Sequence, residues 1–348
     1  MAKKEKDKQT VEEIMAKINK DWGGNIIHYG VSRTEYERIP FTSPRLNYIT
    51  HGGLPKNRLN EFYGDEGGGK TTHALDVVAN YQQLEDAKTV LWLDAERTLD
   101  VVWAGKLGVD VDNMLLLNPE TQGAEALFEQ TLRLIDTGEI GFVVIDSLGI
   151  MLSDQAYEKT VEDKTYGGIS MALTRFSKEA VPLCAKHECT LIGINQVRAD
   201  MNSPYGALTT TGGKAWRHNC SCRMEFRKGY LFDNKYGKIS RSAERPFGHV
   251  VDVYMAKNKT CASNRLNGFD TLRYDIGIDY LYDLTEVCKK YDVIEQSGSW
   301  YYLKDVETGD ELKKLQGQYA VSDFLGDEAN IDILKMYEDF LDKKIKED

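Results

Sequence analysis

The chain has 348 residues, of which 41% are hydrophobic and 28% are charged, and its formal net charge is −11. The composition is typical of a soluble protein, and the length fits one large domain with a smaller one, or two medium domains. The sequence contains no run of about 18 apolar residues, so no membrane-spanning helix is predicted. The acidic balance disfavours a nucleic-acid binder that relies on overall charge, so any DNA contact must come from a local surface.

The first ten residues, MAKKEKDKQT, are charged and lack the apolar stretch of a secretory signal. The 6 cysteines do not show the spacings of a disulfide framework in a small secreted domain. Both features favour a reducing, cytoplasmic setting.

Helical spacing of apolar residues predicts a short amphipathic helix over Thr10–Lys20. Apolar runs that follow predict strands at Arg58–Tyr63, Thr89–Leu93, Met114–Leu117, Phe142–Ile145, Thr190–Ile194, Ser221–Phe226, Val250–Met255 and Phe269–Tyr274. Helical patterns between the earlier strands lie at 70–85, 98–107, 122–136 and 166–187. This alternation predicts an α/β fold with a mainly parallel sheet covered on both faces, and the later strands, which lack intervening helices, predict an antiparallel extension.

The pattern changes after about Gly277. A helix at 282–290, a β unit around SWYYL (299–303) and a helix at 329–343 predict a small α+β domain over 278–348. We expect Trp300, Tyr301 and Tyr302 to form its core. The domain division is therefore 1–32, 33–277 and 278–348.

The segment Gly64-Asp-Glu-Gly-Gly-Gly-Lys70-Thr71 follows a predicted strand and opens a predicted helix. That context predicts a phosphate-binding loop, in which glycines let backbone amides surround phosphate oxygens at a helix N-terminus. Lys70 would reach the β- and γ-phosphates of ATP, and the Thr71 hydroxyl would hold Mg²⁺. The alternative, a plain glycine-rich turn, does not require this strand–loop–helix order.

Three polar residues end predicted strands, at the strand ends where ligands bind in open α/β sheets. Asp146 follows FVVI and is a candidate for the metal; Glu96 follows VLWLDA and is either a general base or a surface carboxylate in a turn. Gln196 follows LIGIN and would contact the γ-phosphate. The segment Val197–Gly213 after it lacks helical periodicity, and we expect an irregular functional loop.

Several segments resemble the RecA family of bacterial recombinases over nearly the whole chain. LDAERTLD (93–100), AGKLGVDVDN (104–113), GINQVR (193–198), TTTGG (209–213) and KNK (257–259) occur in the family's order. INKDWGGNIIHYG near the N-terminus and GSWYYL near the C-terminus are also similar. The resemblance implies a RecA-type ATPase core that hydrolyses ATP, forms filaments on single-stranded DNA, pairs it with homologous duplex and exchanges strands, in a bacterial cell or a phage-infected bacterium.

The resemblance also implies roles for particular residues. Nucleotide contacts would come from Gly64, Asp65, Glu66, Gly67, Gly68, Gly69, Lys70, Thr71, Thr72, Asp100, Trp103 and Tyr274, and Mg²⁺ would be held by Thr71 and Asp146. Catalysis would use Glu96, Lys70 and Gln196, with Lys257 and Lys259 supplied by the neighbouring protomer. DNA contacts would come from Tyr166, Lys178, Arg198, Thr211, Gly212, Gly213 and Lys214, with a second DNA-facing loop at about Tyr157–Gly167. The N-terminal helix would dock on a neighbour.

The chain also departs from the family's pattern. Met171 and Lys178 stand where the family has DNA-contacting arginines, His218 replaces an aromatic residue that couples protomers, and residues 229–249 form a longer hairpin. The basic residues Lys228, Lys235, Lys238, Arg241 and Arg245 are either a duplex-binding ridge or a solvated hairpin. Two alternatives therefore stay open: a ring-forming DNA motor such as a hexameric helicase, and a DNA-binding scaffold or co-protease without strand exchange.

Overall fold

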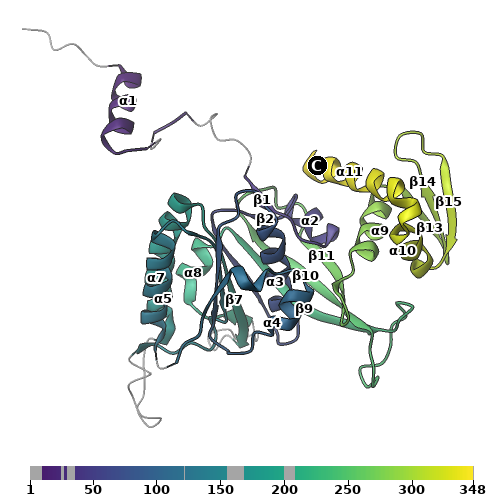
Figure 1. Cartoon of the computed structure of the whole chain (residues 1–348), viewed down its shortest axis with the longest axis horizontal. Helices are drawn as coiled ribbons and strands as arrows, with labels where there is room; N and C mark the ends of the chain where they lie inside the picture. The colour runs from purple at the N-terminus through teal and green to yellow at the C-terminus, as the bar shows by residue number, and fades with distance from the viewer. Residues whose placement is uncertain are drawn as a thin grey trace, which may run out of the picture. The chain divides into compact units, whose positions relative to one another are not determined.

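The computed structural model describes residues 10–24, 27–29, 36–120, 122–154, 168–199 and 208–347 (Figure 1). The chain divides into two compact units, up to Glu37 and from Arg38 onward. In the first unit, helix α1 (Val11–Asp21) confirms the predicted N-terminal helix. Its first turn is closed by Thr10, whose hydroxyl accepts from the Glu13 amide at 3.2 Å, while the Glu13 carboxylate accepts from the Thr10 amide at 3.0 Å.

The second unit is built on one large sheet with the strand order β12-β11-β10-β9-β3-β7-β6-β4-β5, and β8 pairs with β7 beside this path. The strands are β3 (Leu59–Gly64), β4 (Thr89–Asp94), β5 (Met114–Leu117), β6 (Ile140–Asp146), β7 (Thr190–Ala199), β8 (Leu208–Thr210), β9 (Cys222–Phe232), β10 (Gly248–Asn258), β11 (Asn267–Arg273) and β12 (Gly277–Ile278). Pairing is parallel from β9 through β3, β7, β6 and β4 to β5, and antiparallel from β9 to β12. The predicted α/β class with an antiparallel extension is confirmed.

Helices cover both faces of this sheet (Figure 1). On one face lie α2 (Pro44–Thr50), α3 (Lys70–Gln82) and α4 (Val101–Lys106); on the other lie α5 (Ala124–Asp136), α7 (Gly168–His187) and α8 (Gly213–Asn219). Strand β4 shows why its sequence is continuously apolar. Val90 and Trp92 enter the first core while Leu91 and Leu93 enter the second, because successive side chains of a strand point to opposite faces.

One predicted feature of the central unit is corrected, and two short helices appear that the sequence pattern does not predict. The segment Val197–Gly213 is not irregular throughout, because β7 continues to Ala199 and pairs antiparallel with β8, Val197 opposite Thr210. Helix α8 begins at Gly213, the last residue of that segment, and like α2 it has 7 residues. Helices of 7 residues present too few apolar positions for a periodic pattern.

The C-terminal part has its own apolar core. It contains α9 (Tyr280–Lys290), β13 (Ile294–Ser297), β14 (Trp300–Lys304), β15 (Glu311–Gln316), α10 (Gln318–Gly326) and α11 (Ile331–Glu347). Tyr301 is buried there as expected, but the expectation for Trp300 is wrong, since 40% of it is exposed and the Lys314 ammonium lies 4.8 Å from its ring centre. Outside these elements lie the short strands β1 (Arg38–Ile39) and β2 (Leu54–Pro55) and the 3₁₀ helices Val111–Asn113 and Glu328–Asn330.

The C-terminal part is joined to α2 by buried polar contacts. The Ser43 hydroxyl donates to Asp283 of α9 at 2.6 Å, and Arg45 donates to Glu286 at 3.0 Å. The division predicted at 277 and 278 stays a prediction. Among the described residues, no helix is both long and apolar enough to cross a membrane.

Candidate active site

The predicted phosphate-binding loop connects β3 to the N-terminus of α3. Gly64 has φ 147°, and a Cβ there would fall on the carbonyl oxygen of Phe226. Gly69, with φ 87°, caps α3 in the left-handed region, which favours glycine. The glycines therefore permit a tight turn pressed against β9, and the unpaired amides and positive end of α3 open toward the same side, where an anion is favoured.

Lys70, the first residue of α3, closes over this loop. Its ammonium donates to the carbonyl oxygen of Gly64 at 3.1 Å and to that of Asp65 at 2.6 Å. Burial lowers the pKa of Lys70, while the negative charges of Asp146 and Glu96 oppose that shift. A buried ammonium held only by backbone carbonyls is ready to exchange them for phosphate oxygens.

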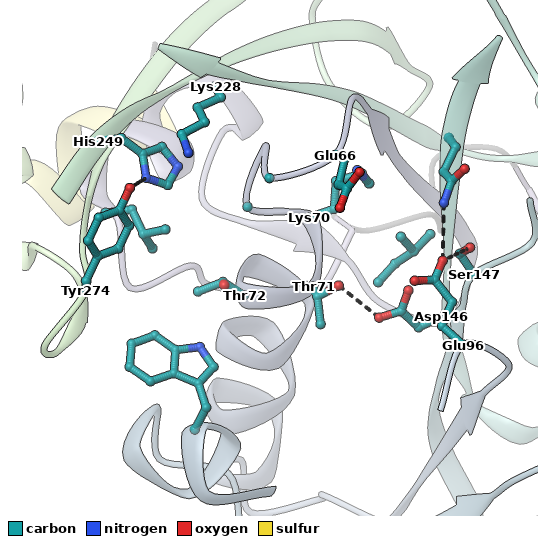
Figure 2. Close-up of a pocket in the computed structure, with 16 residues that line it drawn as sticks. Glu66, Lys70, Thr71, Thr72, Glu96, Asp146, Ser147, Lys228, His249 and Tyr274 are labelled. Carbon is teal, nitrogen blue, oxygen red and sulfur yellow. Dashed lines mark hydrogen bonds between the residues drawn. The ribbon is translucent and has the colours of Figure 1, made fainter. Parts of the chain in front are cut away.

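Thr71 and Asp146 meet at the carboxyl edge of the sheet. The Thr71 hydroxyl donates to Asp146 Oδ2 at 2.9 Å, from the first turn of α3 to the end of β6 (Figure 2). Burial raises the pKa of Asp146 to about 7; the hydrogen bond from Thr71 opposes the rise, and the charges of Glu96 and Asp94 add to it. Two hard oxygen donors thus stand side by side in a negatively charged environment.

Glu96 is fixed by the strand ends around it. The carbonyl of Asp146 accepts from the amides of Ala95 and Glu96, at 2.7 and 3.3 Å. The Glu96 carboxylate in turn accepts from the Ser147 hydroxyl and, at 3.3 Å, from Gln196 Nε2. Glu96 is therefore not a loosely placed surface carboxylate, because three neighbouring strands determine its position.

These groups line a cavity of about 520 Å³. Its lining residues are Glu66, Gly67, Gly69, Lys70, Thr71, Thr72, Glu96, Trp103, Asp146, Ser147, Ile194, Gln196, Lys228, His249, Leu272 and Tyr274. In Figure 2, Glu96, Asp146 and Ser147 lie at one end and Lys228, His249 and Tyr274 at the other, with Lys70, Thr71 and Thr72 between them. The cavity is long enough to separate a polar, acidic end from an aromatic one.

The aromatic end contains residues that the sequence patterns did not reveal. His249 and Lys228 come from β10 and β9, and only the pairing of β9 with β3 brings them to the loop. His249 Nδ1 lies 3.0 Å from the Tyr274 hydroxyl, and its Nε2 is buried without a hydrogen-bond partner. Burial, with the nearby charge of Lys228, lowers the pKa of His249 to about 4, so the ring is neutral at physiological pH.

Some predicted nucleotide-site residues do not line this cavity. Gly64, Asp65 and Gly68 form the loop's backbone. The Asp100 carboxylate caps α4 by accepting from the amides of Val102 and Trp103, both at 2.9 Å, and so orients the Trp103 side chain that does line the cavity.

Lys257 and Lys259 lie together at the C-terminus of α8. Both ammonium groups donate to the carbonyl oxygen of His218, at 2.8 and 2.7 Å, and Lys257 also donates to that of Arg217 at 2.6 Å. Burial, with the adjacent charge of Lys259, lowers the pKa of Lys257 to about 8. Neither lysine lines the cavity of its own chain.

The predicted DNA-binding residues that the structure describes lie in two places. Tyr166 and the expected loop at 157–167 lie outside the described residues. Lys178 is exposed on α7. Arg198 donates to the Gly149 carbonyl at 2.6 Å, and Thr211, Gly212, Gly213 and Lys214 lie where β8 passes into α8.

A buried carboxylate holds this last region in place. Glu61 Oε1 accepts from Asn195 Nδ2 and from Trp216 Nε1, both at 2.9 Å, and Glu61 Oε2 accepts from Arg223. Asn195 Nδ2 also donates to the Thr211 carbonyl at 2.9 Å. The segment after Gln196 is thus tied at both ends to β3, the strand that leads into the phosphate-binding loop.

Comparisons with known proteins agree with this architecture. The RecA N-terminal domain family matches residues 9–279. The protein RecA of Fusobacterium nucleatum is 33% identical over 323 residues, which cover 92% of this chain and 82% of that protein. That of Clostridioides difficile is 33% identical over 329 residues (93% and 88%), and that of Prochlorococcus marinus is 30% identical over 347 residues (99% and 89%).

Proposed function

The chain belongs to the RecA family, and we propose that it is a DNA-dependent ATPase that forms filaments on single-stranded DNA, pairs the strand with homologous duplex and exchanges strands. One observation carries the coupling of ATP to DNA. The strand that supplies Gln196 to the catalytic carboxylate continues directly into the antiparallel pair β7–β8, at the predicted DNA-binding segment. Because its relatives are bacterial proteins, we propose that it acts in the cytoplasm of a bacterial cell or of a phage-infected bacterium.

ATP binding uses both ends of the cavity. The amides of the loop and the positive end of α3 attract the phosphates, and Lys70 leaves the loop carbonyls to pair with the β- and γ-phosphate oxygens. Trp103 and Tyr274 supply flat apolar surfaces for the adenine at the other end.

Mg²⁺ fits the donor set at the acidic end. Thr71 Oγ1 and Asp146 Oδ2 are oxygen ligands 2.9 Å apart, and Mg²⁺ in nucleotide sites takes few protein oxygens, with phosphates and water filling the rest. Held by Thr71 and Asp146, Mg²⁺ would supply positive charge that offsets the charge of the phosphates.

Glu96 acts as the general base in hydrolysis. Its carboxylate accepts a proton from the attacking water while the water oxygen forms the new bond to the γ-phosphorus and the bond to the ADP oxygen breaks. Ser147 and Gln196 hold the carboxylate toward the cavity by donating to Oε1. Oε2 is left for the water.

Gln196 links this chemistry to DNA. The Gln196 amide makes only a long hydrogen bond of 3.3 Å to Glu96. The γ-phosphate of bound ATP would offer this amide a charged acceptor at closer range, and a shorter charge-assisted hydrogen bond is stronger. Movement of the Gln196 side chain shifts β7 and with it the β7–β8 pair. Arg198 and the Thr211–Lys214 turn would then present amides and charge to the DNA backbone.

Assembly would complete the site. Lys257 and Lys259 lie at the end of α8, the helix that starts at the DNA-binding turn, and they do not reach the cavity of their own chain. In a head-to-tail filament they would face the neighbour's phosphates and neutralise developing charge there.

The test is strand exchange between circular single-stranded DNA and a homologous linear duplex, with ATP and Mg²⁺. We expect joint molecules and then nicked circles, and none with Lys70→Ala. Duplex unwinding without joint molecules, together with closed rings in electron micrographs, would instead establish a ring-forming motor. DNA binding without either activity would leave only a scaffold.

A further inference from the structure

A buried pair of ionisable residues lies directly beneath the phosphate-binding loop. His73, in the first turn of α3, and Asp270, on β11, are both 0% exposed. His73 Nδ1 is 2.7 Å from the carbonyl oxygen of Gly69, and His73 Nε2 contacts Asp270 Oδ2. Neither residue lines the cavity, and neither has a role in the function proposed above.

The partners of the ring determine where its protons are. A carbonyl oxygen only accepts hydrogen bonds, so Nδ1 must carry a proton. The other nitrogen faces a carboxylate, which also accepts, so a second proton lies between Nε2 and Asp270. The ring nitrogen, the carboxyl group and the proton that they share therefore form a hydrogen-bonded pair, which makes two buried ionisable groups tolerable.

The bond to Gly69 fixes one particular peptide plane. The Gly69 carbonyl receives two donors from the helix side, the His73 ring and the His73 amide, which is 3.0 Å away. A trans peptide is planar, so the N–H of the same unit, which belongs to Lys70, points the opposite way. That amide is the first of α3 and points toward the site that we assign to the phosphates.

Asp270 connects this plane to the far wall of the cavity. In the antiparallel ladder it lies opposite Val251 of β10, and the same strand β11 carries Leu272, which lines the cavity just before Tyr274. One ion pair thus joins the helix that holds phosphates to the strand that holds the aromatic end.

We propose that His73 is a positioning residue of the nucleotide site, and that Asp270 holds the His73 ring with its Nδ1 donating to the Gly69 carbonyl, so that the Gly69–Lys70 peptide stays turned with its amide toward the phosphates. The inference rests on the proposed binding of ATP at this loop. It assigns a structural role to two residues that lie 197 positions apart in the sequence and outside the cavity, since together they determine the conformation of the phosphate-binding loop.

The test measures equilibrium ATP binding by the full-length chain at about pH 7.5. The double variant His73→Leu/Asp270→Leu replaces both partners by apolar groups of similar size, which avoids a buried unpaired charge. We expect its Kd for ATP to rise about fivefold to tenfold, the worth of one hydrogen bond. Turnover at saturating ATP should change less than about twofold, because Glu96 is held by other strands.

Two single variants separate positioning from simple packing. In Asp270→Asn the amide donates to Nε2, so His73 keeps its Nδ1 proton on Gly69, and the Kd for ATP should stay within about twofold of wild type. Asp76→Asn, a change on the same buried helix face, should also leave the Kd near wild type. A loss of affinity in Asp270→Asn as large as that of the double variant, or an unchanged Kd in a folded double variant, overturns the inference. Failure of the wild-type chain to bind ATP at all overturns the proposed function, and this inference with it.

Discussion

Gln196 and Glu96 share a hydrogen bond across the carboxyl edge of the sheet, with Gln196 Nε2 donating to Glu96 Oε1 at 3.3 Å over a sequence separation of 100 residues. One side chain thereby touches both the proposed general base and, through its own strand, the predicted DNA-binding segment. The contact is long enough to be given up for a charged acceptor, and that exchange is the proposed switch between nucleotide and DNA.

Shortening this side chain should uncouple the two sites. In Gln196→Asn the amide is one methylene further from Glu96, and it can bridge neither to the carboxylate nor to a γ-phosphate. We predict that the ratio of ATP hydrolysis rates with and without single-stranded DNA falls close to one. ATP affinity, measured in parallel, should change less than about threefold, since the loop and Lys70 are untouched. A variant that keeps the full stimulation would remove Gln196 from the coupling.

Mixing two inactive variants should restore activity. Glu96→Gln lacks the base and should lose about 10²–10⁴-fold in turnover while still forming filaments with ATP. Lys257→Ala/Lys259→Ala lacks the two cations. If the lysines act in the neighbouring protomer, about one interface in four of a random 1:1 mixture combines an intact Glu96 with intact lysines. We predict that the mixture hydrolyses ATP at about that fraction of the wild-type rate, measured by phosphate release on single-stranded DNA. A mixture as inactive as its components would place the lysines in their own subunit's site or outside it.

The hydroxyl of Thr71 should determine the Mg²⁺ concentration that ATP hydrolysis requires. Thr71→Ala removes one of the two oxygen ligands and should raise the Mg²⁺ concentration for half-maximal ATP hydrolysis by about tenfold. Thr71→Ser keeps the hydroxyl and is the matched control, expected within about twofold of wild type. An equal response of both variants would assign the effect to packing of the methyl group. Titrations with Mg²⁺ at fixed ATP distinguish these outcomes.

Asp76 should make stability depend on pH. Its carboxylate accepts from the Thr42 amide at 3.0 Å, but burial raises its pKa to about 6 from an ordinary 3.8. A carboxyl group with a raised folded-state pKa favours the folded state when protonated, and that contribution is lost as the pH rises from about 4 to 6. Asn accepts the same hydrogen bond without ionising. Relative to wild type, Asp76→Asn should therefore be more stable at pH 8 than at pH 5 by on the order of 1 kcal/mol in denaturant unfolding. No difference between the two pH values would mean that the carboxyl is not desolvated.

Local patterns were enough to predict one half of the site. Lys70, Thr71, Glu96 and Asp146 each lie at the end of an apolar run or the start of a helix, and parallel strands end on one edge. That these residues lie close to one another follows from the fold class alone. The structure places all of them in one cavity.

The other half depends on pairings that no local pattern encodes. Lys228 and His249 lie on long antiparallel strands, and only the alignment of β9 with β3 turns them toward the loop. In the sequence, nothing distinguishes His73 from the other residues of its helix. Its role depends on Asp270, which strand β11 brings into contact with it. Trp300 was expected in a core because it is large and apolar, but a cation over its ring makes exposure tolerable.

The most direct test of the account is steady-state ATP hydrolysis measured against increasing single-stranded DNA. The account predicts a rate that rises with DNA to a plateau in the wild-type chain and disappears in Lys70→Ala. A wild-type rate that does not change with DNA concentration, or a Lys70→Ala variant that hydrolyses ATP normally, would contradict it.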